Sequence, residues 1–249
     1  MERNVLGQYL ADFLQTGRFK DYAPNGLQVE GKAEIQTIVT GVTACQALIE
    51  RAIELKADAI LVHHGFFWKN EPDVLVGMKQ RRIKALLAHD INLFGYHLPL
   101  DAHPVVGNNA TLGRRLGILD AEAFEAVGDG LLWGGSLDTA LSGEAFAGLL
   151  AKALGREPLH IGADKPVQRL AWCTGGAQDY IDLAVNLGVD AFISGEVSER
   201  TFHSAKEQGI HYFAAGHHAT ERYGIEALGE HLRREFGLTH HFVDIDNPV

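Results

Sequence analysis

The sequence predicts an α/β protein made of two related α/β repeats. Short β-branched strands alternate with helical segments that end near glycine, and one such stretch recurs in the second half of the chain. Histidines and acidic residues follow the ends of the repeated strands. This alternation is typical of βα units arranged around a largely parallel sheet. A chain of 249 residues, 46% of them hydrophobic, is long enough to bury a substantial core.

The first repeat begins with the strand-like stretch TIVTGV and continues with alternating helical and extended patterns. Strands are predicted where β-branched and apolar residues run together, and helices where apolar residues recur every three or four positions. The predicted order is strand, helix, strand, helix, strand, at residues 37–42, 44–55, 58–64, 77–88 and 91–97.

The second repeat is found by aligning the sequence with itself, which matches residues 38–62 to residues 170–194 without a gap. Six positions are identical: Gln46 and Gln178, Ile49 and Ile181, Ala52 and Ala184, Leu55 and Leu187, Asp58 and Asp190, Ala59 and Ala191. A helix at 198–208 and a strand at 210–216 then repeat the order seen after the first copy. We therefore expect a duplicated α/β unit whose strand ends occupy comparable positions.

The segment between the two copies carries fewer signals. A strand is predicted at 130–137 and a helix at 142–155, with Ser142 as its N-cap and Gly155 as its end. A final helix is predicted at about 220–236. Since no low-complexity linker separates the copies, the boundary is placed only approximately, giving a first unit at 1–125 and a second at 126–249.

The composition argues against several classes of function. The chain has 22 basic and 32 acidic residues, a formal charge of −10, which disfavours nucleic acid binding because that needs clustered Lys and Arg. No apolar run approaches a membrane span, and the N-terminal stretch does not have the pattern of a signal peptide, so a cytoplasmic location is expected. Cys45 and Cys173 are too few for a disulfide framework or a thiolate zinc site.

Potential metal ligands follow three of the predicted strands. His63 and His64 end one strand, HLPLDAH (97–103) follows the next, and AAGHHATE (214–221) follows the corresponding strand of the second copy. Ligands in open α/β sheets bind at the carboxyl ends of the strands, so these side chains are expected to meet. Imidazoles mixed with carboxylates suit Zn, Mn, Fe or Ni better than calcium, which prefers oxygen alone.

The adjacent pair His63 and His64 raises a geometric question. Neighbouring side chains of an extended strand point to opposite faces, so the two rings are expected to serve different ions, bridged by Asp101 or Glu221. The simpler interpretation is that a lone histidine at a strand end is a structural residue. The further pair, His240 and His241, lies in an alternating terminal strand and is expected to be structural or exposed.

Five stretches resemble the motifs of the Nif-three-like family of dinuclear metal proteins: DYAPNGLQVEG, ILVHHGFFWK, GYHLPLDAHPVVGNNA, DAFISGEVSE and AAGHHATER. The resemblance implies two related α/β units with a dinuclear metal site in the cleft between them, assembled as a ring-shaped homohexamer. It also implies the ligands: His63 and Asp101 for one metal, His64 and His217 for the other, and Glu221 for both.

Bacterial members of this family are commonly named GTP cyclohydrolase type 2 homologues. The resemblance therefore implies a metal-dependent hydrolase that opens the guanine ring of GTP or a related nucleotide with water activated by two metals, zinc among the candidates. His97, His103 or Glu196 could carry protons. The alternative is a non-catalytic metal-binding ring that binds a partner protein or a nucleotide.

Overall fold

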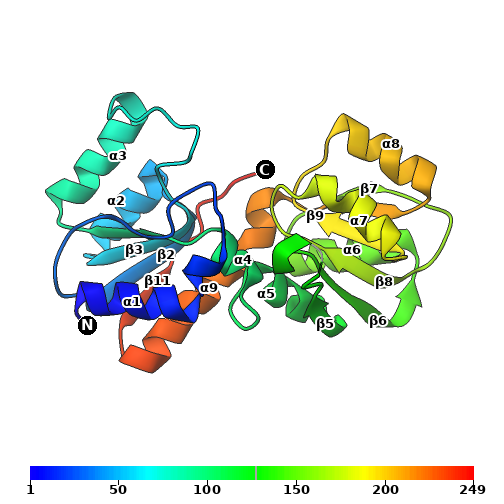
Figure 1. Cartoon of the computed structure of the whole chain (residues 1–249), viewed down its shortest axis with the longest axis horizontal. Coiled ribbons are helices and arrows are strands. Elements are labelled where there is room, and N and C mark those ends of the chain that lie inside the picture. Colours follow the sequence, from blue (N-terminus) through cyan, green and yellow to red (C-terminus); the bar gives the residue numbers. More distant parts are fainter. Residues whose placement is uncertain (127) are drawn as a thin grey trace. The chain divides into compact units, whose positions relative to one another are not determined.

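The computed structural model describes residues 1–126 and 128–249 (Figure 1). They form two compact units, each with its own sheet. The first consists of Met1–Leu100 and Gly224–Asp246, and the second of Asp101–Tyr223 and Asn247–Val249. The boundary near residue 125 expected from the sequence therefore lies inside the second unit, just after strand β5 (Leu119–Ala123).

The sheet of the first unit has the strand order β1-β4-β3-β2-β11. Four neighbouring strands are parallel, and only β1 at the edge is antiparallel. The carboxyl ends of β2, β3 and β4 therefore meet at one edge. The strand bounds are β1 Gly26–Val29, β2 Thr37–Thr43, β3 Ala59–His64, β4 Asn92–Gly95 and β11 Thr239–Phe242.

Helices cover both faces of this sheet. Leu48 and Ile49 of α2 and Ile83 of α3 share one hydrophobic core with Val39 and Ile60 of the sheet. Figure 1 shows α1 on the opposite face, together with the end of α9. The helix bounds are α1 Arg3–Phe13, η1 Thr16–Arg18, α2 Gln46–Glu54, α3 Gly77–Ala88, α4 Leu98–Ala102 and α9 His217–Phe236.

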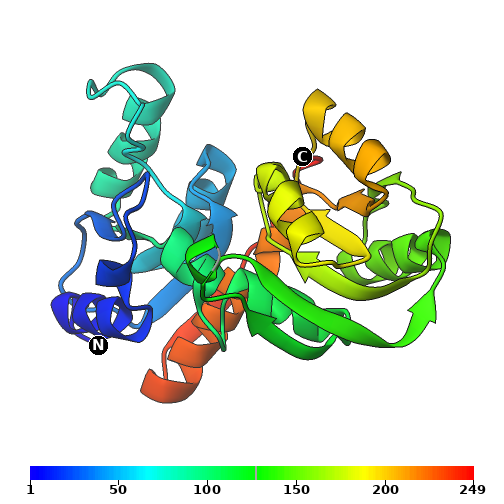
Figure 2. The same ribbon diagram turned by 45° about the vertical axis from the view of Figure 1, so that its right-hand side comes forward.

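The sheet of the second unit has the order β5-β6-β8-β9-β10-β7, with β8, β9 and β10 parallel. Phe146 and Leu150 of α6 pack on one face of this sheet, while Ile181 of α7 and Ala205 of α8 pack on the other (Figure 2). The remaining bounds are α5 Asn108–Arg115, η2 Gly128–Gly130, β6 Trp133–Leu141, α6 Gly143–Leu154, β7 Leu159–Ile161, β8 Val167–Trp172, η3 Gln178–Tyr180, α7 Ile181–Asn186, β9 Ala191–Ser194, α8 Glu199–Gln208 and β10 His211–Ala214.

The two sheets confirm the internal repeat. Ile38 lies opposite Ala59 in the first unit and Leu170 lies opposite Ala191 in the second, so the aligned residues of the two copies share one pairing register. Both units also have the element order strand, helix, strand, helix, strand. The prediction of two related α/β repeats is therefore confirmed.

A pair of equivalent carboxylates explains one of the six identities. Asp58 accepts hydrogen bonds from the backbone amides of Gln36 and Thr37, at 2.9 and 3.0 Å. Asp190 accepts the corresponding bonds from Gln168 and Arg169, at 3.1 and 2.8 Å. In each unit this acid directly precedes one parallel strand. Its hydrogen bonds hold it to the start of the neighbouring strand.

Individual elements follow the prediction with small shifts. The Ser142 side chain accepts a hydrogen bond from the Ala145 amide, and Gly155 ends α6 in the left-handed conformation, both as expected. The strand expected at 130–137 is displaced to Trp133–Leu141, because Gly128–Gly130 forms a 3-10 turn ahead of it. Helix α9 begins at His217, slightly before its expected start.

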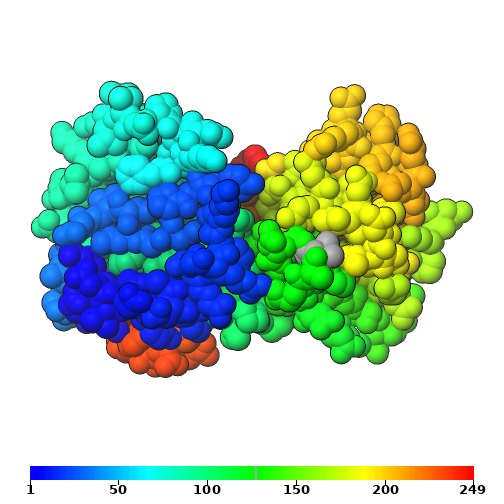
Figure 3. Space-filling view, viewed as in Figure 1, coloured from blue at the N-terminus to red at the C-terminus, as the bar shows by residue number. Residues whose placement is uncertain are grey.

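The surface of the first unit includes the segment between β3 and α3, drawn in cyan in Figure 3. Val74, Leu75 and Val76 on this segment, and Met78 at the start of α3, are each at least half exposed. Among the described helices, none combines the length with the apolar composition needed to cross a membrane.

Candidate metal centre

Three histidines gather at the carboxyl edge of the first sheet. His63 and His64 end β3, and His97 follows β4. The ring centroid of His63 lies 4.5 Å from that of His64 and 5.2 Å from that of His97, and His64 and His97 are 5.8 Å apart. Nitrogens of the three rings lie within 4.8 Å of one another, so this group could hold a metal ion.

Each of these rings is held through Nδ1 by a partner in the same unit. The contacts are His63 to the Tyr96 carbonyl at 2.9 Å, His64 to the Thr43 hydroxyl at 3.2 Å, and His97 to the Asp21 carboxylate at 2.7 Å. Since carbonyl and carboxylate oxygens only accept, Nδ1 of His63 and of His97 must donate. In each of these two rings Nε2 is therefore the nitrogen with a lone pair that could bind a metal or accept a proton.

His63 and His64 lie closer together than strand alternation suggests. Both residues belong to β3, and His64 is its last residue. The two rings differ in surroundings, since His63 is buried and His64 is partly exposed. Whether each serves a separate ion stays a prediction.

The aromatic residues after the histidine pair have separate roles. Phe66 is buried in the core of the first unit, whereas the Trp68 ring meets His97 edge to face at 4.9 Å. The Trp68 indole N–H donates to the Gly65 carbonyl at 3.2 Å. Phe67 has a positive φ of 64°, and its amide donates to the Glu71 carboxylate. The loop thus holds Trp68 rigidly beside the histidines.

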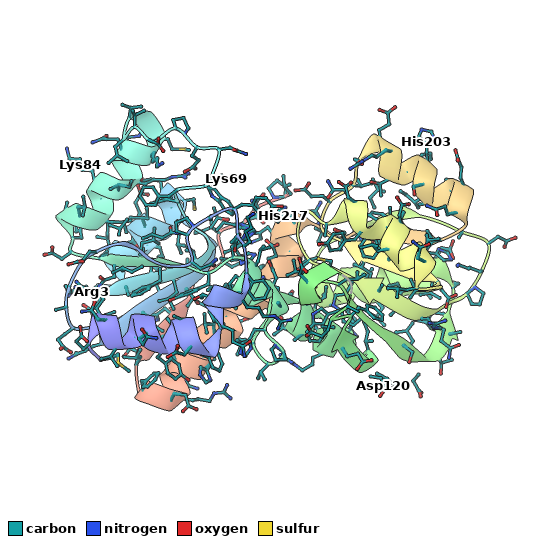
Figure 4. The ribbon with its side chains drawn as sticks, viewed as in Figure 1. Arg3, Lys69, Lys84, Asp120, His203 and His217 are labelled. Carbon is teal, nitrogen blue, oxygen red and sulfur yellow. The ribbon has the colours of Figure 1, made fainter. Side chains whose placement is uncertain are left out.

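In the second unit, His217 and Glu221 lie on the first two turns of α9, and Figure 4 labels His217. The Nε2 atom of His217 is 3.2 Å from Oε2 of Glu221, because the four-residue spacing places both side chains on one face of the helix. The Glu221 side chain is 3% exposed and that of His217 is 28% exposed. A buried carboxylate is therefore paired with a more accessible imidazole.

Asp101 is the second buried carboxylate of this unit, with 6% exposure. Its Oδ1 accepts a hydrogen bond from the Asn108 amide at 2.8 Å and another from the Thr174 hydroxyl at 3.3 Å. These donors fix the orientation of the carboxylate, as outer partners of metal ligands commonly do. Neither donor could be recognised from the sequence, although Asn108 lies in the stretch GYHLPLDAHPVVGNNA.

Glu196 holds the other side of the His217 ring. Its Oε1 accepts a hydrogen bond from Nδ1 of His217 at 2.6 Å. Burial lowers the pKa of His217, but the hydrogen bonds and negative charges of Glu221 and Glu196 outweigh it and raise the pKa to about 9. This contact gives Glu196, proposed from the sequence as a proton carrier, an orienting role toward His217.

Two glycines allow the backbone to approach these ligands. A Cβ atom on Gly175, whose φ is +68°, would lie 2.0 Å from Oε1 of Glu221 and 3.1 Å from Nε2 of His217. A Cβ on Gly195 would lie 2.6 Å from the Cα of His217. Only glycine fits at both positions, so the loops after β8 and β9 are shaped around His217 and Glu221.

Two other histidines of the described residues have hydrogen bonds elsewhere. Nδ1 of His103 accepts hydrogen bonds from the amides of Val105 and Val106 and so stabilises its own turn. His240 lies at 2.8 Å from the Thr40 hydroxyl through Nε2 and at 2.9 Å from Glu230 through Nδ1. His240 is therefore structural, as expected. Cys173 is buried, and burial followed by the charges of Asp101 and Glu221 raises the pKa of its thiol.

The donor set fits a first-row divalent metal. Imidazole nitrogens whose Nδ1 atoms are engaged, and carboxylates oriented by hydrogen bonds, are the usual surroundings of Zn, Mn, Fe or Ni. Calcium would require an oxygen-rich shell. The described residues therefore include groups suited to holding such an ion.

Comparison with known proteins places this chain in a family. Residues 1–248 match the family model of Duf34/NIF3 (NGG1p interacting factor 3). The chain belongs to the Duf34/NIF3 family. This membership confirms the resemblance inferred from the motifs.

Relatives in this family are similar over their whole length. A Vibrio cholerae protein named GTP cyclohydrolase 1 type 2 homolog is 58% identical over 252 residues, covering 100% of both chains. A protein of the same name from Allochromatium vinosum is 56% identical, covering 97% of this chain and 95% of the relative.

Solved structures of the family have the same fold. The protein ybgI, described as of unknown function, superposes with a TM-score of 0.96 at 53% identity, and the match covers 100% of both chains. TTHA1606 from Thermus thermophilus has a TM-score of 0.90 at 34% identity and also covers 100% of both chains.

Proposed function

We propose that the protein is a hydrolase that depends on two divalent metal ions. His63 and Asp101 would hold one ion, His64 and His217 the other, and Glu221 would contact both. The observation that carries this proposal is that each unit presents oriented imidazoles or carboxylates after the ends of its repeated strands. A homohexameric ring and a cytoplasmic location belong to the same proposal.

The residues around the ligands support hydrolysis over a purely structural metal site. A pair of divalent ions supplies Lewis acidity and lowers the pKa of a coordinated water toward neutrality. A structural zinc site is usually closed and rich in cysteine, whereas Cys173 here is a buried thiol with a raised pKa. His97 lies beside His63 and His64 and is 17% exposed, so it can accept a proton at Nε2 and return it to a leaving group.

The proposed substrate is GTP or a related nucleotide with a flat heterocyclic base. Relatives carry the name GTP cyclohydrolase 1 type 2 homolog, and in this chain the Trp68 ring lies next to His97. An aromatic side chain held by its own hydrogen bond can stack against such a base with little loss of conformational freedom. Opening of the guanine imidazole ring by water would release formate.

Formate release tests this function. Protein loaded with zinc or manganese should release formate from GTP, and His64→Ala should abolish the release because it removes a proposed ligand. The matched control is His89→Ala, which changes an exposed histidine at the end of α3 whose Nδ1 contacts the Ala85 carbonyl. No formate above the His64→Ala background in a metal-loaded, folded sample would rule out the GTP reaction.

Metal binding should release nearly one proton from His217 between pH 7 and 8. The pKa of this imidazole is raised to about 9, so it is protonated there, and it must lose that proton to become a ligand. The release should fade as the pH rises through about 9, where His217 is already neutral. Titration calorimetry in two buffers with different ionisation enthalpies measures it, and a His217→Gln variant serves as the control. Equal proton release by both proteins would contradict the assignment.

A further inference from the structure

The loop before β1 contains a buried acid, Asp21, that the proposed ligand set does not use. The Asp21 side chain is only 3% exposed. Its Oδ2 accepts hydrogen bonds from the Asn25 amide at 2.9 Å and from the Leu98 backbone at 3.0 Å, and its Oδ1 accepts one from His97 at 2.7 Å. A carboxylate buried this deeply is costly unless its oxygens are bonded, and these bonds all converge on the residues around His97.

The same loop fixes the backbone of His97. The Asn25 side-chain oxygen accepts the His97 amide at 2.8 Å. The Tyr22 carbonyl accepts the Lys69 amide at 2.7 Å, which joins this loop to the loop that carries Trp68. The stretch DYAPNG, whose role the sequence alone did not reveal, thus holds His97 by both its main chain and its ring.

The direction of the Asp21 contact decides which nitrogen of His97 carries the proton. A carboxylate can only accept, so Nδ1 is the donor and Nε2 presents a lone pair. Burial raises the pKa of Asp21, but the hydrogen bond and charge of His97 and the bonds from Asn25 and Tyr22 outweigh it and lower the pKa to about 2. Asp21 therefore remains an acceptor at neutral and mildly acidic pH.

We propose that Asp21 is a positioning residue that keeps the proton of His97 on Nδ1, so that Nε2 is the atom that accepts a proton on a ring that lies beside His63 and His64. This inference rests on the proposed function, in which His97 moves a proton during hydrolysis. The arrangement parallels serine hydrolase triads, in which an acid orients a histidine without itself becoming protonated. There an Asp→Asn change leaves the geometry intact and lowers kcat about 10⁴-fold because the imidazole adopts the wrong tautomer.

A matched control is available in the same unit. Asp58 is also partly buried, with 14% side-chain exposure, and its carboxylate accepts two backbone amides and the Lys32 ammonium. These bonds do not involve His97, and Asp58 lies before the start of β3, whereas the histidines lie at its end. Asp58→Asn therefore removes a buried charge without changing the tautomer of His97.

Asp21→Asn tests the inference by ¹⁵N NMR of the imidazoles in zinc-loaded protein. We expect His97 to be protonated at Nδ1 in the wild type and in Asp58→Asn, and to lose that preference in Asp21→Asn. The kcat for formate release should fall by about 10²–10⁴-fold in Asp21→Asn, with KM and metal content close to those of the wild type. His97→Gln should lower kcat similarly, and the double variant should lose little more, because both changes remove the same step.

The outcomes separate this inference from the proposed function. An unchanged His97 tautomer in Asp21→Asn, or an Nε2-protonated His97 in the wild type, would overturn the positioning role whatever the activity. If Asp21→Asn fails to fold, the wild-type spectrum alone still shows which nitrogen of His97 carries the proton. Absence of formate from the wild type would instead overturn the proposed reaction, and the spectra would still decide whether Asp21 sets the tautomer.

Discussion

Replacement of Glu221 by Gln should reduce the metal content from two ions per chain to one or none and should lower hydrolysis by more than 100-fold. Glu221 is 2% exposed, and its carboxylate lies 3.2 Å from His217. Glutamine keeps the shape but removes the charge and offers a single weak oxygen ligand. Loss of an outer partner already costs about 10–100-fold in metal affinity, so loss of a ligand shared by two ions should cost more. Elemental analysis of protein purified and dialysed in parallel measures the effect.

The control for this variant is Glu226→Gln on the same helix. This substitution also removes one negative charge, but it lies further along α9 than His217 and Glu221. It should therefore leave the metal content unchanged. A Glu221→Gln protein that still carries two ions would exclude Glu221 as a shared ligand. The removal of negative charge should also lower the pKa of His217, because the Glu221 hydrogen bond and charge raise it.

The repeated fold could be predicted because its determinants are local. Strand and helix patterns depend on residues close in sequence, and the gapless alignment of 38–62 with 170–194 compared one copy with the other without knowledge of the structure. The identity of Asp58 and Asp190 pointed to a shared role, which proves to be the same pair of backbone hydrogen bonds in each sheet. The return of the chain as β11 beside β2 could not be predicted, since pairing between strands from opposite ends of the chain leaves no periodic signal.

The sequence likewise predicts only part of the candidate site. The positions of His63, His64 and His97 followed from strand ends, and the contact of His217 with Glu221 followed from helical spacing. The residues that orient them were missed, because Asp21 lies 76 positions from His97. A turn motif such as DYAPNG predicts a bend in the chain but not the side chain that the bend will hold.

The same limitation affected Glu196. The sequence indicated Glu196 only as one of three possible proton carriers, and its contact with Nδ1 of His217 is visible only in the fold. Asp21 and Glu196 thus have parallel positions, one in each unit, since each accepts a hydrogen bond from the Nδ1 of a histidine. A histidine whose Nδ1 is anchored by a carboxylate has its ring orientation fixed and its Nε2 made more basic.

Replacement of Gly175 by Ala should abolish metal binding and lower the stability of the fold. The residue has a φ of +68°, so any side chain costs about 1–2 kcal/mol in the left-handed conformation. Its Cβ would also lie 2.0 Å from Oε1 of Glu221, which is a steric clash. The Glu221 carboxylate must therefore shift, and we expect that in its new position it no longer binds one ion together with His217. Elemental analysis and urea unfolding measure the two effects separately.

Gly188→Ala separates backbone strain from displacement of the ligand. Gly188 lies in the same unit with the same φ of +68°, but the atom nearest to its added Cβ is 3.9 Å away, on Arg169. It should therefore lose about 1–2 kcal/mol of stability and keep its full metal content. If Gly175→Ala bound as much metal as Gly188→Ala, the close approach of the β8 loop to Glu221 would be irrelevant to the site. If only Gly175→Ala lost metal, this glycine would be required because it leaves room for the Glu221 carboxylate beside His217.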